Sequence, residues 1–502
     1  MDLRHPGDDS ERTLARLLEI PPLADELGTR LAAAGFTCWL VGGSVRDLLL
    51  NSSLTTPDLD FATDATPEQV LSAVEGWADS TWEAGVAFGT VGLARRGVRL
   101  EVTTFRSESY EPGSRKPQVG YGDSIDADLS RRDFTINAMA VSVPDHLFVD
   151  LYGGLRDLAA GKLRTPVAPH QSFDDDPLRM MRAARFAAQL GFTPIIDVVL
   201  AMTEMAGRLE IVSAERVREE FSRLLLSPNP AKGLELLVET GICEFVVPEI
   251  PRMRMAMDPI HHHKDVYLHS VAVLKNAIKL EPPPDPDVEE SGPDLVLRMA
   301  ALLHDIGKPD TRRFEDGGRV SFHHHEVVGA KLARKRLKAM RYDKQFVSDV
   351  ATLVELHLRF HGYGRGEWTD SAVRRYVTDA GPLLERLHRL VRSDCTTRNR
   401  SKAAGLAAAY DEFEHRIRHL QEQEDLRAVR PDLSGEDIMR LLGLAPGPLV
   451  GKAWRHLKEV RLDRGPLSEE EATAELLAWA QAEGIAPESP QSGQSDQRDH
   501  PI

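Results

Sequence analysis

The hydrophobic pattern of this chain changes its period at about residue 172, and this change most constrains the fold. Before it, residues 35–105 mix two signals: FTCWLVGG is a short apolar run that ends in glycines, and VRLEVTTF alternates with a period of two. Thr66, Pro67 and Gln69 mark a helix start between them. After it, stretches such as LRMMRAARFAAQLGF have apolar residues three and four positions apart, as a helix face does. The sequence predicts an α+β chain, with a small α/β domain followed by a nearly all-helical remainder.

Length and composition limit the class of protein. A chain of 502 residues predicts about three or four domains, at roughly 100 to 200 residues each. No apolar run reaches the roughly 18 residues that a membrane span needs, and the first residues lack the apolar stretch of a signal peptide. Cys38, Cys243 and Cys395 are scattered, without pair spacing. We therefore expect a cytoplasmic protein that makes no membrane contact.

The net charge of −16 argues against a protein that holds nucleic acid by bulk charge. Any RNA binding then depends on local basic surfaces. One segment has a basic residue every three positions, at Lys452, Arg455, Lys458, Arg461 and Arg464. An ordinary solvated helix face has the same spacing, so this stripe alone does not identify an RNA-binding surface.

Glycines follow the first predicted strand and open a helix. Gly42 and Gly43 come directly after the strand, and Arg46 lies three residues further on. Glycine lets the backbone approach a phosphate, the amides of the helix start point at the anion, and an arginine adds charge-assisted hydrogen bonds. A GG turn is also a common plain connection, so the motif indicates a phosphate site only together with others.

Three acids follow on predicted strands. Asp58 and Asp60 lie two positions apart, so a strand projects both carboxylates from one face, while Leu59 faces the core. Glu101 lies in VRLEVTTF, and a third acid on a neighbouring strand would complete a site for two metal ions. Clustered carboxylates repel one another unless a cation lies between them, which favours Mg²⁺. A solvated DxD pair is the alternative.

Two further motifs combine acids with arginines. RRDFTINA covers residues 131–138, and DDPLRMMRAARF covers 175–186. In the second, we expect the acids at a helix start, with Arg179, Arg182 and Arg185 at intervals of three. Asp176 accepts from the exocyclic amine of cytosine or adenine and Arg179 donates to the same base edge, so the pair can read a base without a nucleic-acid template. Three arginines at this spacing are also typical of a solvated helix face.

Taken in order, GGSVRD, DLD, LEVTTFR, RRDFTINA, DLYGGLRDL and DDPLRMMRAARFAAQLGF resemble the class II tRNA nucleotidyltransferase and bacterial poly(A) polymerase family over roughly residues 35–250. The resemblance implies a nucleotidyltransferase head, then a helical neck, body and tail, that add C, C and A to the 3′ end of tRNA from CTP and ATP. It implies Mg²⁺ binding at Asp58 and Asp60, and with Glu101 from the strand argument these are the expected catalytic acids. It implies nucleotide contacts at Gly43, Arg46, Arg132, Asp133, Asn137, Asp176, Arg179, Arg182 and Arg185.

Two details refine the resemblance. The family often has Glu before its template Asp, whereas this chain has Asp175, a shorter acid. Residues 106–131 lack a clear period and contain Pro and Gly. In the family this segment is a flexible loop that helps the site switch from CTP to ATP. Its full length predicts an enzyme that does not stop after two cytidines.

Imidazoles and carboxylates recur through the helical region, at His269, His304, Asp305, His325, His357 and Asp394. A single buried histidine is usually a satisfied core residue, but this series resembles the HD phosphohydrolase superfamily. The resemblance implies a divalent transition metal that generates a hydroxide for attack on phosphorus. Among His323, His324 and His325 it favours His325, because Glu326 and Gly329 follow in the family's manner.

The sequence thus predicts six segments: an N-terminal helical segment at 1–34, the head at 35–165, a template and RNA-binding neck at 166–255, an HD domain at 256–400, a tRNA-binding helical tail at 401–486 and a disordered end at 487–502. Three alternatives remain. One is a poly(A) polymerase that uses the same residues, and another is an HD phosphodiesterase whose head only senses nucleotides. The third, an RNA-binding module without catalysis, conflicts with the intact acids.

Overall fold

A computed structural model of the chain describes residues 19–50, 58–82, 89–109, 118–121, 124–255, 265–285, 291–315, 320–362, 368–397, 399–424 and 430–485. Two compact units contain them: Met1–Ala256 with Arg336–Asp343, and Met257–Lys335 with Lys344–Ile502. The predicted N-terminal segment is described only from residue 19, and the predicted disordered end lies outside the described residues. Each unit is described by itself.

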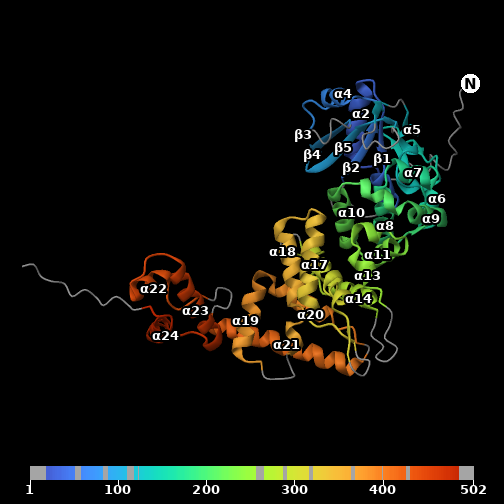
Figure 1. Cartoon of the computed structure of the whole chain (residues 1–502). Helices are drawn as coiled ribbons and strands as arrows, with labels where there is room; N and C mark the ends of the chain where they lie inside the picture. The colour runs from blue at the N-terminus through green and yellow to red at the C-terminus, as the bar shows by residue number, and fades with distance from the viewer. Residues whose placement is uncertain are drawn as a thin grey trace, which may run out of the picture. The chain divides into compact units, whose positions relative to one another are not determined.

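A seven-stranded sheet with the order β3-β4-β5-β2-β1-β8-β9 forms the core of the head (Figure 1). β2 and β5 pair in parallel, and the other neighbours pair antiparallel. The strands are β1 (Cys38–Val41), β2 (Leu59–Thr63), β3 (Ser80–Trp82), β4 (Thr90–Arg95), β5 (Val98–Thr104), β8 (Ala140–Ser142) and β9 (Phe148–Val149). β6 (Arg106–Ser109) and β7 (Gln118–Tyr121) form a separate pair. The strands predicted in FTCWLVGG and VRLEVTTF are therefore confirmed as β1 and β5.

Short helices join these strands, with bounds α2 (Pro22–Ala33), α3 (Gly43–Leu49), α4 (Pro67–Ala73), α5 (Ile125–Ser130) and α6 (Gly154–Ala159). The predicted helix start is confirmed at α4. Thr66 accepts a hydrogen bond from the backbone of Gln69, and the Gln69 side chain accepts one in return, which makes a capping box. Pro67 is the first residue of the helix.

The neck that follows is helical: α7 (Pro169–Asp175), α8 (Leu178–Leu190), α9 (Ile196–Met205), α10 (Ala214–Leu226), α11 (Pro230–Glu239), α12 (Cys243–Val246) and α13 (Glu249–Arg252). α8 packs against both α10 and α11 (Figure 1). Asp176 lies at the start of α8 as expected, where its Oδ1 accepts from the Leu178 amide at 3.2 Å and Pro177 has helical backbone. The expectation was wrong only for Asp175. Asp175 ends α7, and Asp176 is extended because the ring of Pro177 disfavours helical backbone in the residue before it.

Helices make up nearly all of the second unit as described: α14 (Val266–Lys279), α15 (Leu295–Leu303), α16 (Lys308–Thr311), α17 (His325–Ala339), α18 (Lys344–Leu356), α19 (Asp370–Ala380), α20 (Leu384–Ser393), α21 (Arg400–Gln423), α22 (Gly435–Leu442), α23 (Pro448–Arg464) and α24 (Glu469–Ala482). Residues 336–339 of α17 count with the first unit. α15 packs against α14, α18 and α20. The predicted change to helix is confirmed, apart from two-residue strands such as β12 (Arg313–Phe314) and β13 (Val320–Ser321).

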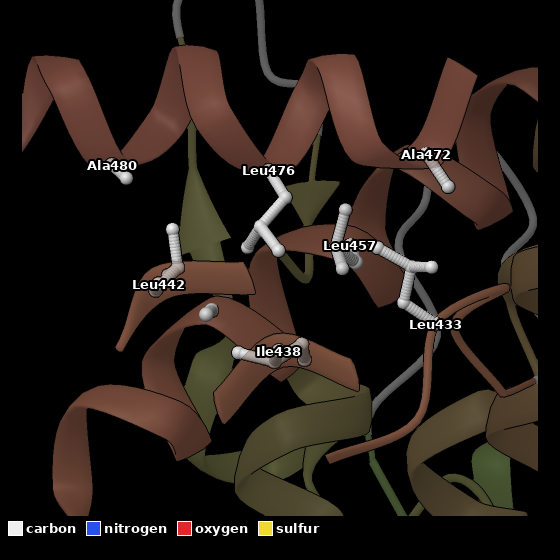
Figure 2. Packing of buried hydrophobic residues seen from close by; sticks show 8 residues of the cluster. Leu433, Ile438, Leu442, Leu457, Ala472, Leu476 and Ala480 are labelled. Atoms are coloured by element: carbon white, nitrogen blue, oxygen red, sulfur yellow. The ribbon is translucent and has the colours of Figure 1, made fainter. Parts of the chain in front are cut away.

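The last three helices have a hydrophobic core of their own (Figure 2). Leu457 of α23 meets Ile438 and Leu442 of α22 and Leu476 of α24, and all four are at most 2% exposed. α23 also carries the predicted basic stripe. Within that stripe Arg461 pairs with Asp432 and Arg464 with Glu475.

Among the described helices, none combines the length and apolar character needed to cross a membrane.

Candidate active sites

The first site contains the three predicted acids at neighbouring strands. Asp60 of β2 and Glu101 of β5 are register partners in the parallel pair, so the two carboxylates lie side by side. Asp58 directly precedes β2 and is exposed. The Ser44 hydroxyl of α3 accepts from the Asp60 amide at 2.9 Å and donates to the Asp58 carbonyl at 3.3 Å. The start of α3 is thereby tied to the strand that holds the acids.

Electrostatics shows that this acid cluster is strained without a cation. The pKa of Asp60 is raised to about 6, mainly by burial; the charge of Arg132 opposes the shift, and the charges of Glu101 and Asp58 add to it. Carboxylate oxygens at this spacing are the ligands that hard divalent cations prefer. The donor set therefore fits a metal ion where the start of β2 lies beside the middle of β5.

A glycine turn brings an arginine to the acids. Gly42 has φ of 70°, which a side chain disfavours, and a Cβ there would lie 2.7 Å from Arg132 Nη1 and 4.0 Å from Asp60 Oδ2. Glycine at this position therefore leaves room for Arg132 to approach Asp60. Gly43 begins α3. The charge of Arg132 lowers the pKa of Asp60, in agreement with this proximity.

Asp133 and Asn137, two of the polar residues of RRDFTINA, form a buried network. Asp133 Oδ1 accepts from the Phe134 amide at 2.8 Å and from Asn137 Nδ2 at 3.0 Å. Arg46 Nη1 donates to Asn137 Oδ1 at 2.8 Å, and its Nε donates to Asp47 at 2.8 Å. Arg46 is 5% exposed, so the protein itself already engages its guanidinium.

Arg182 joins this network to the acids. Its Nη2 lies 2.8 Å from Asp133 Oδ2. Although burial lowers the pKa of Arg182, the carboxylates of Asp133, Glu220, Asp176 and Asp60 raise it above its ordinary value. Arg182 therefore lies within electrostatic reach of both Asp60 and Asp176.

The predicted template pair lies where α7 meets α8. Arg179 is 8% exposed and donates through Nη1 to the Ser172 hydroxyl at 2.8 Å and to the Ser172 carbonyl at 3.2 Å. Its Nη2 donates to the Arg131 carbonyl. Asp176 pairs with Arg216 Nη2 at 3.0 Å. Burial and fixed partners exclude a solvated arginine face for Arg179.

Arg185 is as buried as Arg179, at 8% exposure. Its Nε donates to Glu220 Oε2 at 2.6 Å and its Nη1 to Gln189 at 2.9 Å, with its guanidinium 4.2 Å from the centre of the Phe186 ring. Sequence reasoning assigned no role to Arg216 or Glu220, although both lie in SAERVREEF. Their spacing of four residues, which puts both on one helix face, was the available signal.

The second site gathers the six predicted residues of the HD region. His269, His304 and Asp305 form one possible metal-ligand group, and Asp305, His325 and His357 form another, so Asp305 belongs to both. Asp394 lies 2.9 Å from His269 Nε2. His323 and His324 lie elsewhere, because His323 pairs with Glu315 and the His324 side chain is 83% exposed.

Backbone carbonyls fix the orientation of three of these histidines. The Nδ1 atoms of His304, His325 and His357 lie 2.9, 2.8 and 2.6 Å from the carbonyl three residues earlier in each case. With the proton on Nδ1, each ring turns its Nε2 lone pair toward Asp305, the arrangement that metal-binding imidazoles use. His325 Nε2 is buried and lacks a hydrogen-bond partner among the described residues. The donor set therefore fits a metal ion.

Close backbone packing places Asp305 beside His325. A Cβ on Gly307 would lie 2.2 Å from the His325 carbonyl, so only glycine lets the turn after Asp305 reach the start of α17. Lys308 Nζ donates to Asp305 Oδ2 at 2.6 Å. Burial lowers the pKa of His357 to about 3, which keeps its imidazole neutral.

Three family descriptions match consecutive parts of the chain. The poly(A) polymerase head domain matches residues 38–164, the probable RNA and SrmB-binding site of polymerase A matches 191–253, and the HD domain matches 266–396. An A-adding tRNA nucleotidyltransferase of Deinococcus radiodurans is 36% identical over 366 residues, which cover 71% of this chain and 80% of that protein.

A CC-adding tRNA nucleotidyltransferase of Thermus thermophilus is 33% identical over 455 residues, 88% of this chain and 95% of that one. The chain belongs to the tRNA nucleotidyltransferase family. Among solved structures, the CCA-adding enzyme of Bacillus stearothermophilus in complex with CTP matches this nucleotidyltransferase with a TM-score of 0.62 at 25% identity, covering 92% of this chain and 99% of that one. The resemblance seen in the sequence is confirmed. The head and the HD domain both belong to metal-dependent domain families.

Proposed function

We propose that this nucleotidyltransferase adds C, C and A in turn to the 3′ end of tRNA, using CTP and ATP without a nucleic-acid template. The observation that carries the proposal is the position of Arg182, whose charge interacts with both Asp60 and Asp176. A metal-binding acid and a base-reading acid around one cation are what template-free nucleotidyl transfer needs. The similar Bacillus stearothermophilus enzyme binds CTP and is named CCA-adding.

Asp58 and Asp60 would hold Mg²⁺, with Glu101 as the third acid beside them. Bound there, Mg²⁺ neutralises triphosphate oxygens and favours the ionised form of the attacking hydroxyl. The tRNA 3′ oxygen bonds to the α-phosphorus, the bond to the β-phosphate oxygen breaks, and pyrophosphate leaves. Arg132 points Nη1 toward Asp60, where it can pair with a phosphate oxygen. Gly43, Arg46, Asp133 and Asn137 shape the nucleotide pocket around it.

Base choice would rest on Asp176 and Arg179. A guanidinium has five N–H donors, and three hydrogen bonds to Ser172 and Arg131 hold that of Arg179 in place. The remaining donors are available for a base edge, while Asp176 accepts from an exocyclic amine. Arg182 would contact the triphosphate. We expect Arg185 to support α8, because Glu220 and Gln189 already bind its guanidinium.

The A-adding and CC-adding relatives make partial addition the main alternative. The loop at 106–131 predicts complete addition, but its residues 110–117 and 122–123 lie outside the described residues, so that argument stays a prediction. Poly(A) synthesis is the other alternative.

A tRNA transcript that lacks its last three nucleotides tests the proposal. It is incubated with purified protein and Mg²⁺, and with CTP, ATP or both, and the products are resolved at single-nucleotide resolution. We expect two C from CTP alone and a further A when ATP is present. Arrest after two C with both nucleotides would show a CC-adding enzyme. Addition of A only to a transcript that already ends in CC would show an A-adding one, and an A ladder from ATP alone would show a poly(A) polymerase.

We also propose a second activity, hydrolysis of phosphoesters at the HD site with a divalent transition metal. The support is the shared position of Asp305 between two ligand groups and the fixed Nε2 orientation of His304, His325 and His357. With Mn²⁺, Ni²⁺ or Co²⁺ supplied in turn, bis-p-nitrophenyl phosphate should be hydrolysed. Absence of hydrolysis with every metal would leave the HD domain a structural part.

The predicted segments retain their proposed roles: head at 35–165, template neck at 166–255, HD domain at 256–400 and tRNA-binding tail at 401–486. In the tail, Lys452 and Arg455 of α23 are exposed, and Lys458 lies 5.8 Å from the centre of the Trp454 ring. These cations suit contacts to tRNA phosphates. We propose that the enzyme works in the cytoplasm, where its tRNA and nucleotide substrates are.

A further inference from the structure

A single buried carboxylate on α5 holds the arginines of the nucleotide site. Asp128 has a side-chain exposure of 1%. Its Oδ2 accepts from Arg132 Nε at 3.1 Å and from Arg132 Nη2 at 2.8 Å. Its Oδ1 accepts from Arg131 Nε at 3.1 Å and also from Arg131 Nη2. Each carboxylate oxygen thus receives two N–H groups from one guanidinium.

We call these contacts of Asp128 with Arg131 and Arg132 the Asp128 clamp. The clamp determines which edge of the Arg132 guanidinium faces Asp60. With Nε and Nη2 bound to Asp128, Nη1 is the nitrogen that points away, and it lies beside Gly42 near Asp60. Lysine cannot make the same two-point contact, because its single ammonium lacks the planar fork. Asp128 therefore sets the direction of Nη1 by holding the opposite edge of the guanidinium.

The same carboxylate acts on the base-reading side through the main chain. Arg179 Nη2 donates to the carbonyl of Arg131, whose own side chain is bound to Asp128. Fixing Arg131 fixes that carbonyl, and the carbonyl in turn fixes the guanidinium of Arg179. Asp128 thus connects to Arg132 by a side chain and to Arg179 by a peptide group.

The charge state of Asp128 fits this role. Burial alone would raise its pKa, but the charges of Arg132 and Arg131 lower it below the ordinary value, so the carboxylate is ionised at neutral pH. An ionised acceptor makes four charge-assisted hydrogen bonds, whereas an amide at the same place offers a single oxygen and an NH₂ group that repels a guanidinium.

We propose that Asp128 is a positioning residue for nucleotide binding, which orients Arg132 toward the triphosphate and Arg179 toward the base. The proposal rests on the proposed function of the same site. It predicts that loss of the carboxylate weakens nucleotide binding and base discrimination together, although Asp128 contacts neither the phosphates nor the base.

The test compares D128N with D126N in the full-length enzyme. Asp126 is exposed on the same helix, so its variant makes the same chemical change away from the site. We expect D128N to raise KM for CTP and for ATP by about 10-fold or more, to change kcat less than KM, and to increase incorporation of UTP or GTP, while D126N matches the wild type. Equal KM and equal misincorporation in D128N and D126N would overturn the proposal.

Epistasis separates positioning from general destabilisation. R132K alone should raise KM for the same nucleotides, and D128N combined with R132K should cost less than the product of the two single effects, because both act in part through the Arg132 guanidinium. If the double variant raised KM by the full product of the two single fold-increases, the clamp would be contradicted. If circular dichroism shows that D128N does not fold, D128E replaces it in the test, because glutamate keeps the negative charge but displaces the carboxylate. A wild-type KM in a folded D128E would then refute the proposal.

The experiment also separates this inference from the proposed function. KM is measured for whichever nucleotides the wild type incorporates. A wild type that adds only A or only two C would refute complete CCA addition, while the comparison of D128N with D126N would still test the role of Asp128.

Discussion

The two candidate metal sites of this enzyme are built by different means. In the head, carboxylates on two neighbouring parallel strands meet arginines that other carboxylates hold, and Asp58 and Glu101 are exposed. In the HD domain, imidazoles are buried in a helical core, and backbone carbonyls fix them. The head site leaves room for a large anionic substrate and supplies hard oxygen ligands. The HD site is formed by core packing and supplies nitrogen ligands.

This difference suits the two sites to different metal ions. Hard oxygen ligands favour Mg²⁺, which keeps several waters and binds phosphate oxygens, while imidazole favours transition metals. Each site lies within one of the two compact units. A change in one site should therefore leave the chemistry of the other intact, and variants can test this directly.

The largest expected effect is on the head acids. D60N removes one negative charge from the pair with Glu101, so we expect CMP incorporation to fall by a factor of about 10³ or more. Single-turnover extension of tRNA measures it. The internal control is phosphodiester hydrolysis at the HD site, which should be unchanged. Parallel loss of both activities would show that the two sites are coupled or that D60N is misfolded.

The next effect is on metal affinity at the HD site. H325Q removes a buried Nε2 that faces Asp305, so we expect transition-metal affinity to drop by more than about 100-fold. H323Q is the matched control, because His323 lies in the same run but is 71% exposed and pairs with Glu315. Isothermal titration with Mn²⁺ compares them. Equal affinity in the two variants would mean that His325 is not a ligand, and CCA addition should be normal in both.

A third prediction concerns how the neck holds Arg185. Glu220 and Arg185 form a nearly buried pair, with side-chain exposures of 10% and 9%. Burial lowers the pKa of Arg185 and Glu220 opposes this, so E220Q leaves a buried cation without its counter-charge. We expect the free energy of unfolding of the first unit to fall by about 2 kcal/mol.

E219Q provides the control for that measurement. Glu219 pairs with Arg223, but both side chains are more than half exposed, so its loss should change the free energy of unfolding by well under about 1 kcal/mol. Urea denaturation followed by far-UV circular dichroism compares the two variants. An equal loss in both would mean that α10 does not brace α8 through Glu220.

Local patterns in the sequence predicted those parts of this architecture that depend on nearby residues. A period of two located β5 and put Glu101 on its exposed face, and the Thr66 capping box located α4. The turn between α7 and α8 was missed, because the effect of Pro177 on the preceding residue was given too little weight against the run of helix formers.

Long-range partners could not be predicted in the same way. Arg216 and Glu220 acquire their contacts only when α10 packs against α8. Asp128 differs from them, because its partners Arg131 and Arg132 are three and four residues away, a spacing that was available in the sequence. Its burial depends on the packed structure, and Asp126, two residues away on the same helix, is exposed.

The smallest expected effect is a loss of stability of the second unit at acidic pH, which depends on a buried histidine outside the HD site. His388 of α20 is mostly buried and stacks on Tyr376 at 5.9 Å, and its Nδ1 lies 3.8 Å from Glu414. Burial lowers its pKa, although Glu414 and Glu385 oppose the shift and Arg392 adds to it. The folded state therefore resists a proton that the unfolded chain accepts.

Stability of the second unit should consequently be greatest above pH of about 6.5 and decline as the pH falls below the pKa of the unfolded histidine. H388F keeps the ring stack but removes the titrating group, so its stability should decline less between pH 7 and pH 5. The difference should be no more than about 1 kcal/mol. Thermal unfolding of both proteins at the two pH values measures it, and because the HD-site histidines are present in both, their titration cancels. An identical decline in H388F would mean that acid sensitivity arises elsewhere in the unit.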